Sequence, residues 1–341
     1  MPNRLLAIAF AFAAAFGCPA LAQDKVVNLY SARHYDTDEA LYANFTRATG
    51  IKVNRIEAAD EPLLERLRNE GANSPADVLL IVDAARLATA EQAGLFQPAK
   101  SKLLDERIPA EFRAPGGTWF GFSSRARVIV YDPKSVKADD VQTYEDLAAA
   151  RNQGKVCTRP GSHPYMLSLV ASMIEHHGEQ QAEAWARGVV ANFARPARGG
   201  DTDQIRAVAS GECGIALTNS YYLVRLMRSK KPADQAVAQA VTLVWPDQKG
   251  YGTHMNISGG GLARYAPNRE HGIRFLEYLS SDEAQAYFAN GNNEWPVVKS
   301  AVTKNPELAA LGRFKADPLD VGALAKNLAA AQRIVDRVGW K

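Results

Sequence analysis

Tyrosine residues stand at three places where an extended segment of this 341-residue sequence gives way to a helical one. Tyr35 follows the first extended segment, Tyr165 follows one in the middle of the chain, and the adjacent Tyr221 and Tyr222 follow a third. In open α/β sheets, ligands bind in the crevice outside the carboxyl ends of the strands. We therefore expect the four phenols to converge on one crevice.

A phenol binds a metal ion as its anion, and a free tyrosine has a pKa of about 10. The partial positive charge at a helix N-terminus favours the phenolates of Tyr221 and Tyr222, and a trivalent cation favours them far more. Hard, highly charged cations prefer anionic oxygen ligands, whereas Zn²⁺ and Cu⁺ prefer nitrogen or sulfur. These residue types therefore favour Fe³⁺.

A packing role is the alternative for each tyrosine taken alone. Tyrosines after strands commonly pack at a rim and hydrogen-bond to water or backbone. The adjacent pair Tyr221 and Tyr222 fits this role less well, because neighbouring helical positions point about 100° apart. Near the start of a helix, both side chains can instead lean into one cleft.

Histidines offer a second kind of metal chemistry, in which His34 and His163 surround a catalytic ion. Such an enzyme needs an open coordination position and a general base, and no base at a recognisable spacing accompanies them. The sequence has no Cys-x-x-Cys, His-x-x-x-His or Gly-x-Ser-x-Gly pattern, and residues 259–261, three glycines, are expected to form a close-packing turn. We therefore expect a binding protein and not an enzyme.

The elements that must position these residues are short apolar extended runs that alternate with amphipathic helical patterns. Early in the chain this βαβα order predicts a parallel sheet with helices on both faces, and a second α/β series follows. Strands are expected at 26–30, 51–56, 77–82, 155–158 and 214–217, and helices at 38–48, 62–69, 84–93, 144–150, 165–177 and from 221 onward.

Two further extended runs, at 120–132 and 241–245, interrupt this alternation. They predict two α/β lobes that are joined by two extended crossings, and such crossings are natural hinges. On this division, lobe 1 comprises residues 23–124 together with 246–341, and lobe 2 comprises residues 125–245.

The N-terminus is expected to be a secretory signal peptide over residues 1–22. Arg4 precedes an apolar run that is too short to span a bilayer, and Ala20-Leu21-Ala22 has the small-x-small pattern of a cleavage site. The alternative is a lipid-anchored N-terminus at Cys18. Later in the sequence, no stretch is long and apolar enough to cross a membrane.

The net charge of the sequence bears on which partners it could bind. The formal net charge of +3 is too small to indicate nucleic acid or an anionic membrane surface as a partner.

Beyond the signal peptide the chain keeps Cys157 and Cys213, and an even pair in an exported protein indicates one disulfide. Two separately buried thiols are the alternative.

Five segments that are weak signals singly occur here together. They are Leu29-Tyr30-Ser31-Ala32-Arg33-His34-Tyr35, Trp119-Phe120-Gly121-Phe122-Ser123-Ser124-Arg125-Ala126-Arg127, Asn219-Ser220-Tyr221-Tyr222, Asn256-Ile257-Ser258-Gly259-Gly260-Gly261 and Ala266-Pro267-Asn268. With them the sequence resembles, over nearly the whole exported chain, the periplasmic ferric-iron-binding proteins of ABC importers, the FutA/FbpA type. The resemblance implies a type II periplasmic-binding-protein fold, Fe³⁺ as transported ligand, an inner-membrane ABC permease as partner, a periplasmic location and a monomer.

By this resemblance, Tyr35, Tyr165, Tyr221 and Tyr222 supply the phenolates that bind iron. His34 matches a position that ligates iron in some relatives and stands aside in others. Tyr35 and His34 belong to lobe 1 and the other three tyrosines to lobe 2. Closing the cleft then completes the coordination of the metal, and iron stabilises the closed state.

Four phenolates around Fe³⁺ leave one net negative charge, which a semi-buried cleft has to neutralise. Arg225 lies one helical turn after the tyrosine pair and Arg125 lies at the first crossing, and similar proteins use arginines near the site in this way. A surface salt bridge is the alternative role for each.

The alternative function keeps the fold but replaces iron with an organic solute such as a polyamine or thiamine. Sites of that kind need acidic or aromatic cages and not converging phenolates.

Overall fold

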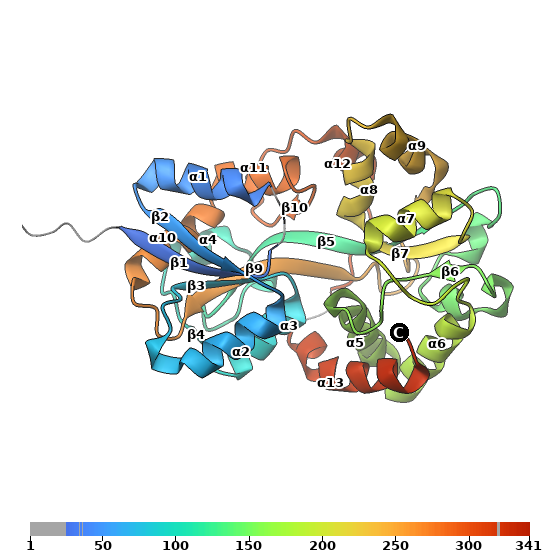
Figure 1. The fold of residues 1–341 in the computed structure, drawn as a ribbon, viewed down its shortest axis with the longest axis horizontal. Coiled ribbons are helices and arrows are strands. Elements are labelled where there is room, and N and C mark those ends of the chain that lie inside the picture. Colours follow the sequence, from blue (N-terminus) through green and yellow to red (C-terminus); the bar gives the residue numbers. More distant parts are fainter. Residues whose placement is uncertain (1–24, 34, 36, 319–320) are drawn as a thin grey trace, which may run out of the picture.

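A computed structural model describes residues 25–33, 35, 37–318 and 321–341. The predicted signal peptide, the alternative lipid anchor at Cys18 and the candidate ligand His34 lie outside these residues. Figure 1 shows two lobes side by side, with strands β5 (Phe120–Tyr131) and β9 (Met255–Ala263) lying next to each other where the lobes join. Among the described helices, none has the length and apolar character needed to cross a bilayer.

The first lobe begins with the three-stranded parallel unit that the sequence predicts. Strand β3 is apolar throughout and buried along its whole length, as expected for a strand covered by helices on both faces. Asp83 caps the following helix by accepting a hydrogen bond from the backbone of Arg86. The elements of this unit are β1 (Val26–Ser31), α1 (Asp38–Thr49), β2 (Lys52–Glu57), α2 (Asp60–Glu70), β3 (Val78–Ile81) and α3 (Ala84–Gln92).

The complete sheet is mixed, because three of the seven strands along its main path run opposite to the other four. Its order is β2-β1-β3-β9-β5-β7-β6, in which β9 (Met255–Ala263) pairs antiparallel with β3 and with β5 (Phe120–Tyr131). The first half of β5 pairs with β9, and its second half pairs antiparallel with β7 (Ile215–Asn219) of the other lobe. Strand β5 is therefore the first predicted crossing.

The position predicted for the second crossing is wrong. Residues 241–245 contain only the short strand β8 (Thr242–Val244), which pairs with the end of β5. The long partner of β5 is β9, and it includes the three glycines that were expected to form a turn. A Cβ atom on Gly261 would lie 2.1 Å from the carbonyl oxygen of Thr118, so glycine allows β9 to fit between its neighbours.

The second lobe contains a smaller parallel unit, in which β6 (Val156–Cys157) pairs with β7. Its helices are α5 (Pro164–His177), α6 (Glu179–Ala191), α7 (Asp201–Ala209), α8 (Ser220–Met227) and α9 (Pro232–Ala240). A disulfide joins Cys157 of β6 to Cys213 in the turn after α7, with 6.0 Å between their Cα atoms.

An α-helix predicted at 144–150 is absent from this part of the chain. Two short 3₁₀ turns, Glu145–Ala148 and Ala150–Asn152, replace it. The carboxylate of Asp146 accepts hydrogen bonds from the backbone of Gln142 and Thr143 and so favours a tight turn.

The C-terminal helix of the chain contacts both lobes. Helix α13 packs against α5 and α6 of the second lobe and against α3 of the first, whereas the predicted division places its residues in lobe 1. The remaining elements are β4 (Phe96–Gln97), α4 (Lys102–Arg107), α10 (Arg269–Leu279), α11 (Asp282–Asn290), β10 (Trp295–Pro296), α12 (Pro306–Ala310) and α13 (Val321–Val338).

Beyond α13, the indole of Trp340 is buried and donates a hydrogen bond to the hydroxyl of Thr158 (2.8 Å). The carbonyl oxygen of Trp340 accepts a hydrogen bond from the backbone of Gly161 (3.1 Å). A Cβ atom on Gly161 would lie 2.7 Å from this indole, so the two segments are in close contact. The C-terminus therefore packs against the loop that leads to Tyr165.

Candidate metal centre

The four tyrosines predicted from the sequence lie in one buried cluster. Tyr35 follows β1 of the first lobe, Tyr165 is the second residue of α5, and Tyr221 and Tyr222 lie in the first turn of α8. Each of the four side chains is less than a tenth exposed. The three strand-to-helix junctions do converge, as the position of ligand sites in α/β sheets predicts.

The phenol groups approach one another across the lobes. The hydroxyl oxygens of Tyr165 and Tyr221 are 3.4 Å apart, and the rings of Tyr35 and Tyr221 make an edge contact with their centroids 5.8 Å apart. The rings of Tyr221 and Tyr222 stack at 4.2 Å. The adjacent pair thus points to one place, as the start of a helix allows.

Burial disfavours the phenolate form of three of these tyrosines. It raises the pKa of Tyr35, Tyr165 and Tyr221 well above the ordinary value for tyrosine. The carboxylate of Glu294 raises the pKa of Tyr35 further, whereas the guanidinium of Arg125 opposes the rise at Tyr165. A cation that binds here has to displace protons from the phenols.

Arg125 is a fully buried cation beside the tyrosines. Its guanidinium lies 5.3 Å from the centre of the Tyr165 ring and donates a hydrogen bond to Ser258 (2.8 Å). Within the described residues, its Nε and Nη2 atoms have no hydrogen-bond partner. Buried donors of this kind are costly unless they face an acceptor or an anion. Arg125 is thus suited to stabilise negative charge on the phenols.

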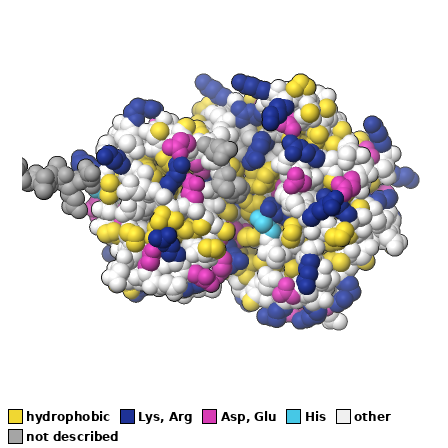
Figure 2. Space-filling model, viewed as in Figure 1, with side chains coloured by type: hydrophobic (Ala, Val, Ile, Leu, Met, Phe, Trp, Pro, Cys, Tyr) yellow, Lys and Arg dark blue, Asp and Glu magenta, His cyan; other side chains and the backbone are white. Residues whose placement is uncertain are grey.

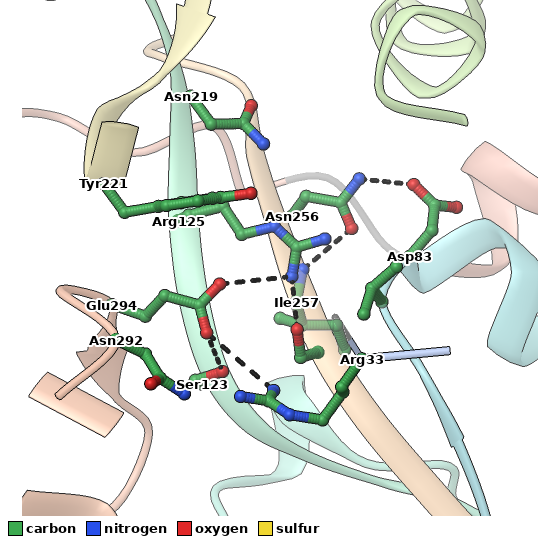
Figure 3. Close-up of polar contacts among 12 residues, drawn as sticks. Arg33, Asp83, Ser123, Arg125, Asn219, Tyr221, Asn256, Ile257, Asn292 and Glu294 are labelled. Atoms are coloured by element: carbon green, nitrogen blue, oxygen red, sulfur yellow. Dashed lines mark hydrogen bonds and ion pairs between the residues drawn. The ribbon is translucent and has the colours of Figure 1, made fainter. Parts of the chain in front are cut away.

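Glu294 is a site residue that the sequence did not reveal. Figure 3 shows its carboxylate between the guanidinium groups of Arg33 and Arg125, at 3.9 Å and 3.8 Å. It accepts hydrogen bonds from the hydroxyls of Tyr35 (2.9 Å) and Ser123 (2.6 Å). Glu294 lies in the loop before β10. In the sequence, the sign that could have pointed to such a residue was Arg125 itself, because an arginine in a buried strand needs a carboxylate to balance its charge.

Arg33 lies in the first of the five segments that carry the family resemblance, but the sequence predicted no role for it. Its guanidinium makes a two-point ion pair with Asp38 at the start of α1, at 2.6 Å and 3.2 Å. It also lies 4.8 Å from the centre of the Tyr35 ring. These contacts hold the segment on which Tyr35 lies.

Arg225 lies over the outer side of the tyrosine pair. Its guanidinium is 5.0 Å from the ring centre of Tyr222 and 5.8 Å from that of Tyr221. No carboxylate of the described chain forms an ion pair with it. This arrangement differs from the surface salt bridge that was its alternative role.

The histidines within the described residues have other contacts. The Nδ1 atom of His163 accepts a hydrogen bond from the backbone of Tyr165 (3.2 Å) and so caps α5. His254 is buried next to Ser168, and burial lowers its pKa to about 3. Across the described ranges, His, Cys, Asp and Glu side chains form no group of three or more that is suited to a metal.

Known proteins with similar sequences and folds identify the family. A model of the bacterial extracellular solute-binding proteins matches residues 40–318. The chain is 49% identical to iron uptake protein A1 of Synechocystis sp., over 94% of this chain and 88% of that protein.

Two solved structures are also similar over most of the chain. FutA of Trichodesmium, in complex with iron and citrate ligands, is 54% identical with a TM-score of 0.86, and the match covers 93% of this chain and 100% of that one. The ferric binding protein of Campylobacter jejuni is 38% identical with a TM-score of 0.89, over 92% and 100%. These similarities confirm the two-lobed type II periplasmic-binding-protein fold. The chain belongs to the bacterial extracellular solute-binding protein family.

Proposed function

We propose that this protein captures ferric iron between Tyr35 of one lobe and Tyr165, Tyr221 and Tyr222 of the other. The observation that carries the proposal is the convergence of these four buried phenols, two of whose hydroxyl oxygens lie 3.4 Å apart. Anionic oxygen ligands suit a hard trivalent cation. His34 remains a candidate fifth ligand on sequence grounds.

The charges around the phenols support this proposal. Binding of Fe³⁺ converts the phenols to phenolates, and four phenolates leave one net negative charge on the complex. Arg125 lies over the ring of Tyr165 and Arg225 over the ring of Tyr222, so both guanidinium groups are close enough to offset that charge. Glu294 has its own partners in Arg33 and Arg125 and holds the hydroxyl of Tyr35.

The relatives support the wider role. Iron uptake protein A1 and the Campylobacter ferric binding protein are named for iron, and their family is that of solute-binding proteins. We infer a periplasmic monomer without enzymatic activity that delivers iron to an ABC-type permease. On the division predicted from the sequence, Tyr35 belongs to lobe 1 (23–124 and 246–341) and the other three tyrosines belong to lobe 2 (125–245), so closure of the lobes around iron would complete the site.

An organic cation such as a polyamine or thiamine fits this cluster less well. It would meet two buried or ring-stacked arginines, and the buried carboxylate of Glu294 already lies between two guanidinium groups. A cage for an organic cation needs unpaired carboxylates or open aromatic faces.

Visible absorption tests the proposal directly, because charge transfer from phenolate to Fe³⁺ colours such a site. Metal-stripped protein is titrated with chelated Fe³⁺ beside a Tyr221→Phe/Tyr222→Phe variant. We expect a band that saturates at one iron per chain in the wild type and is lost or strongly weakened in the variant.

A Tyr265→Phe/Tyr278→Phe variant is the matched control, because these tyrosines lie away from the cluster, and it should behave as the wild type. Acid should bleach the band, since protons compete for phenolates and burial raises the pKa of Tyr165 and of Tyr221. A wild type that develops no band would contradict the assignment of ferric iron.

A further inference from the structure

A hydrogen-bonded chain of buried side chains joins the two lobes through strand β9. It runs from Asp83, which caps α3 of the first lobe, through Asn256 of β9 to Ser168 of α5 in the second lobe. All three residues are buried, and Figure 2 shows the two lobes in contact on the molecular surface. The chain therefore crosses the junction about which the lobes would open.

One nitrogen atom of Asn256 holds both ends of this chain. Its Nδ2 atom donates to a carboxylate oxygen of Asp83 (2.6 Å) and to the hydroxyl oxygen of Ser168 (3.0 Å). Figure 3 shows the amide of Asn256 directed toward Asp83. Because both hydrogens of this nitrogen are in use, Asp83 and Ser168 can be bound together only while α3 and α5 stay close.

The oxygen of the same amide fixes Asn256 to the first lobe. Its Oδ1 atom accepts hydrogen bonds from the backbone of Ala84 (2.9 Å), at the start of α3, and from that of Ile257 (2.8 Å). The amide is thus held at the N-terminus of α3 by two residues, Asp83 and Ala84. When the lobes separate, its bond to Ser168 is the one that has to break.

Ser168 is positioned to receive the bond from Asn256. Its hydroxyl oxygen lies 3.2 Å from Nε2 of His254, and burial lowers the pKa of His254 to about 3. The ring is therefore neutral near pH 7 and can accept the hydroxyl proton, which leaves the lone pairs of the Ser168 oxygen for Asn256. Hydrogen bonds in such a buried place are strong, because little water competes for them.

Helix α5 connects this contact to the tyrosines. Tyr165 is the second residue of α5, and Ser168 follows three residues later. The lobes are closed on each other here, since the ring of Tyr35 from the first lobe contacts that of Tyr221 from the second. A bond that holds α5 against the first lobe therefore also holds the phenols of the two lobes together.

We propose that Asn256 and Ser168 form a latch that favours the closed state, and that they are positioning residues for iron although they lie outside the tyrosine cluster. The proposal rests on the function proposed above and adds a determinant of affinity to it. A ligand that binds the closed state gains apparent affinity in proportion to the population of that state. The latch therefore acts on how long iron is held and not on the bonds between iron and the phenols.

Ser168→Ala tests the latch, because it removes one hydroxyl and leaves the bonds of Asn256 to Asp83 and Ala84. Affinity for Fe³⁺ is measured by competition with citrate, with the visible band reporting the bound metal. We expect the affinity to fall roughly fivefold to tenfold, as the loss of one buried hydrogen bond allows. Transfer of bound iron to EDTA should become faster to a similar degree.

The band of the iron-saturated Ser168→Ala variant should keep the wavelength and intensity of the wild type, and this result also shows that the variant is folded. Ser280→Ala is the matched control, because the buried hydroxyl of Ser280 donates to the backbone of Glu277 (2.7 Å) and both residues belong to the first lobe. It should match the wild type in affinity, in the rate of release and in the band.

Unchanged affinity in Ser168→Ala would overturn the proposal. A shifted or weakened band at saturation would also overturn it, because Ser168 would then act on the phenols themselves and not on closure. A wild type that develops no band would instead refute the iron-binding function, so the two failures can be told apart.

Discussion

Glu294 is the residue on which the charge balance of the buried site depends. It is completely buried, and its two oxygens reach Tyr35, Ser123, Arg33 and Arg125. Taking one partner away from a buried charge is costly, because the remaining charge is left without compensation. The carboxylate therefore stabilises both arginines as well as the position of Tyr35.

Replacement of Glu294 by glutamine should lower the free energy of unfolding by about 2–3 kcal/mol. Glutamine can still accept a hydrogen bond from Tyr35, but it leaves two buried guanidinium groups without a carboxylate between them. Urea unfolding of the metal-free protein measures the effect. Glu283→Gln, an exposed change on α11, serves as the control, and equal stability of the two variants would contradict the role given to Glu294.

Asp60, at the start of α2, should make stability depend on pH. Burial and the neighbouring Asp83 raise its pKa to about 6, while Arg86 and Arg125 oppose the rise. Between the unfolded pKa and this value, the folded protein keeps a proton that the unfolded chain has lost. Stability is therefore fully retained at acid pH and falls as pH rises through about 6.

An Asp60→Asn variant should remove this loss. At pH 8 it should be more stable than the wild type by about 1–3 kcal/mol, and at pH 4 the two should unfold at similar urea concentrations. A stability difference that is the same at both values of pH would show that the charge of Asp60 is not its cause.

Single residues differ in how far the sequence reveals them. The four tyrosines could be predicted because each has a local signal, namely the end of an extended run followed by a helix. Glu294 has no such signal, because its partners lie 171 and 259 residues away along the chain and only the folded structure brings them together. Arg125 could be placed at a crossing, but its hydrogen bond to Ser258 depends on β9 and its ion pair with Glu294 depends on the loop before β10.

At the scale of elements, β9 is the strand that the sequence concealed. Three consecutive glycines are typical of turns, yet here they lie in the middle of a nine-residue strand. Local propensity was overridden by the space between β3 and β5, since side chains there would collide with the neighbouring backbone. The first crossing, by contrast, is rich in β-branched and aromatic residues and was predicted within one residue.

Gly261→Ala should therefore be strongly destabilising, by about 3 kcal/mol or more, because the new methyl group would overlap the carbonyl oxygen of Thr118. Thermal or urea unfolding measures the loss. Gly116→Ala is the matched control, because a Cβ atom there would meet no atom within 4 Å. A tolerant Gly261 would mean that β9 can move away from β5 at little cost.

At the scale of the whole molecule, α13 and Trp340 connect the C-terminus to both lobes. The indole of Trp340 lies near Trp185 and Phe193 and against Gly161, in the loop that leads to Tyr165. Nothing in the sequence near Trp340 indicates this contact, because it joins segments about 180 residues apart. The packing of α13 on the second lobe could not be predicted either.

Trp340→Ala should reduce the free energy of unfolding by about 3–4 kcal/mol, since it empties a buried aromatic position and removes the hydrogen bond to Thr158. It should also weaken iron binding in conditions where the variant is folded, because the loop before Tyr165 loses its support. Lys341→Ala is the control. Unchanged iron affinity in folded Trp340→Ala would show that the loop holds its shape alone.

Trp340 lies about 180 residues after the loop that it supports, and this separation bears on the order in which the molecule folds. A contact between such distant segments closes a long loop, and the chain entropy lost in closing it is greater than for a local contact. The hydroxyl of Tyr35 likewise depends on Glu294, 259 residues further along the chain. We therefore expect the phenols to reach their final arrangement late in folding, after the strands and helices of each lobe have formed.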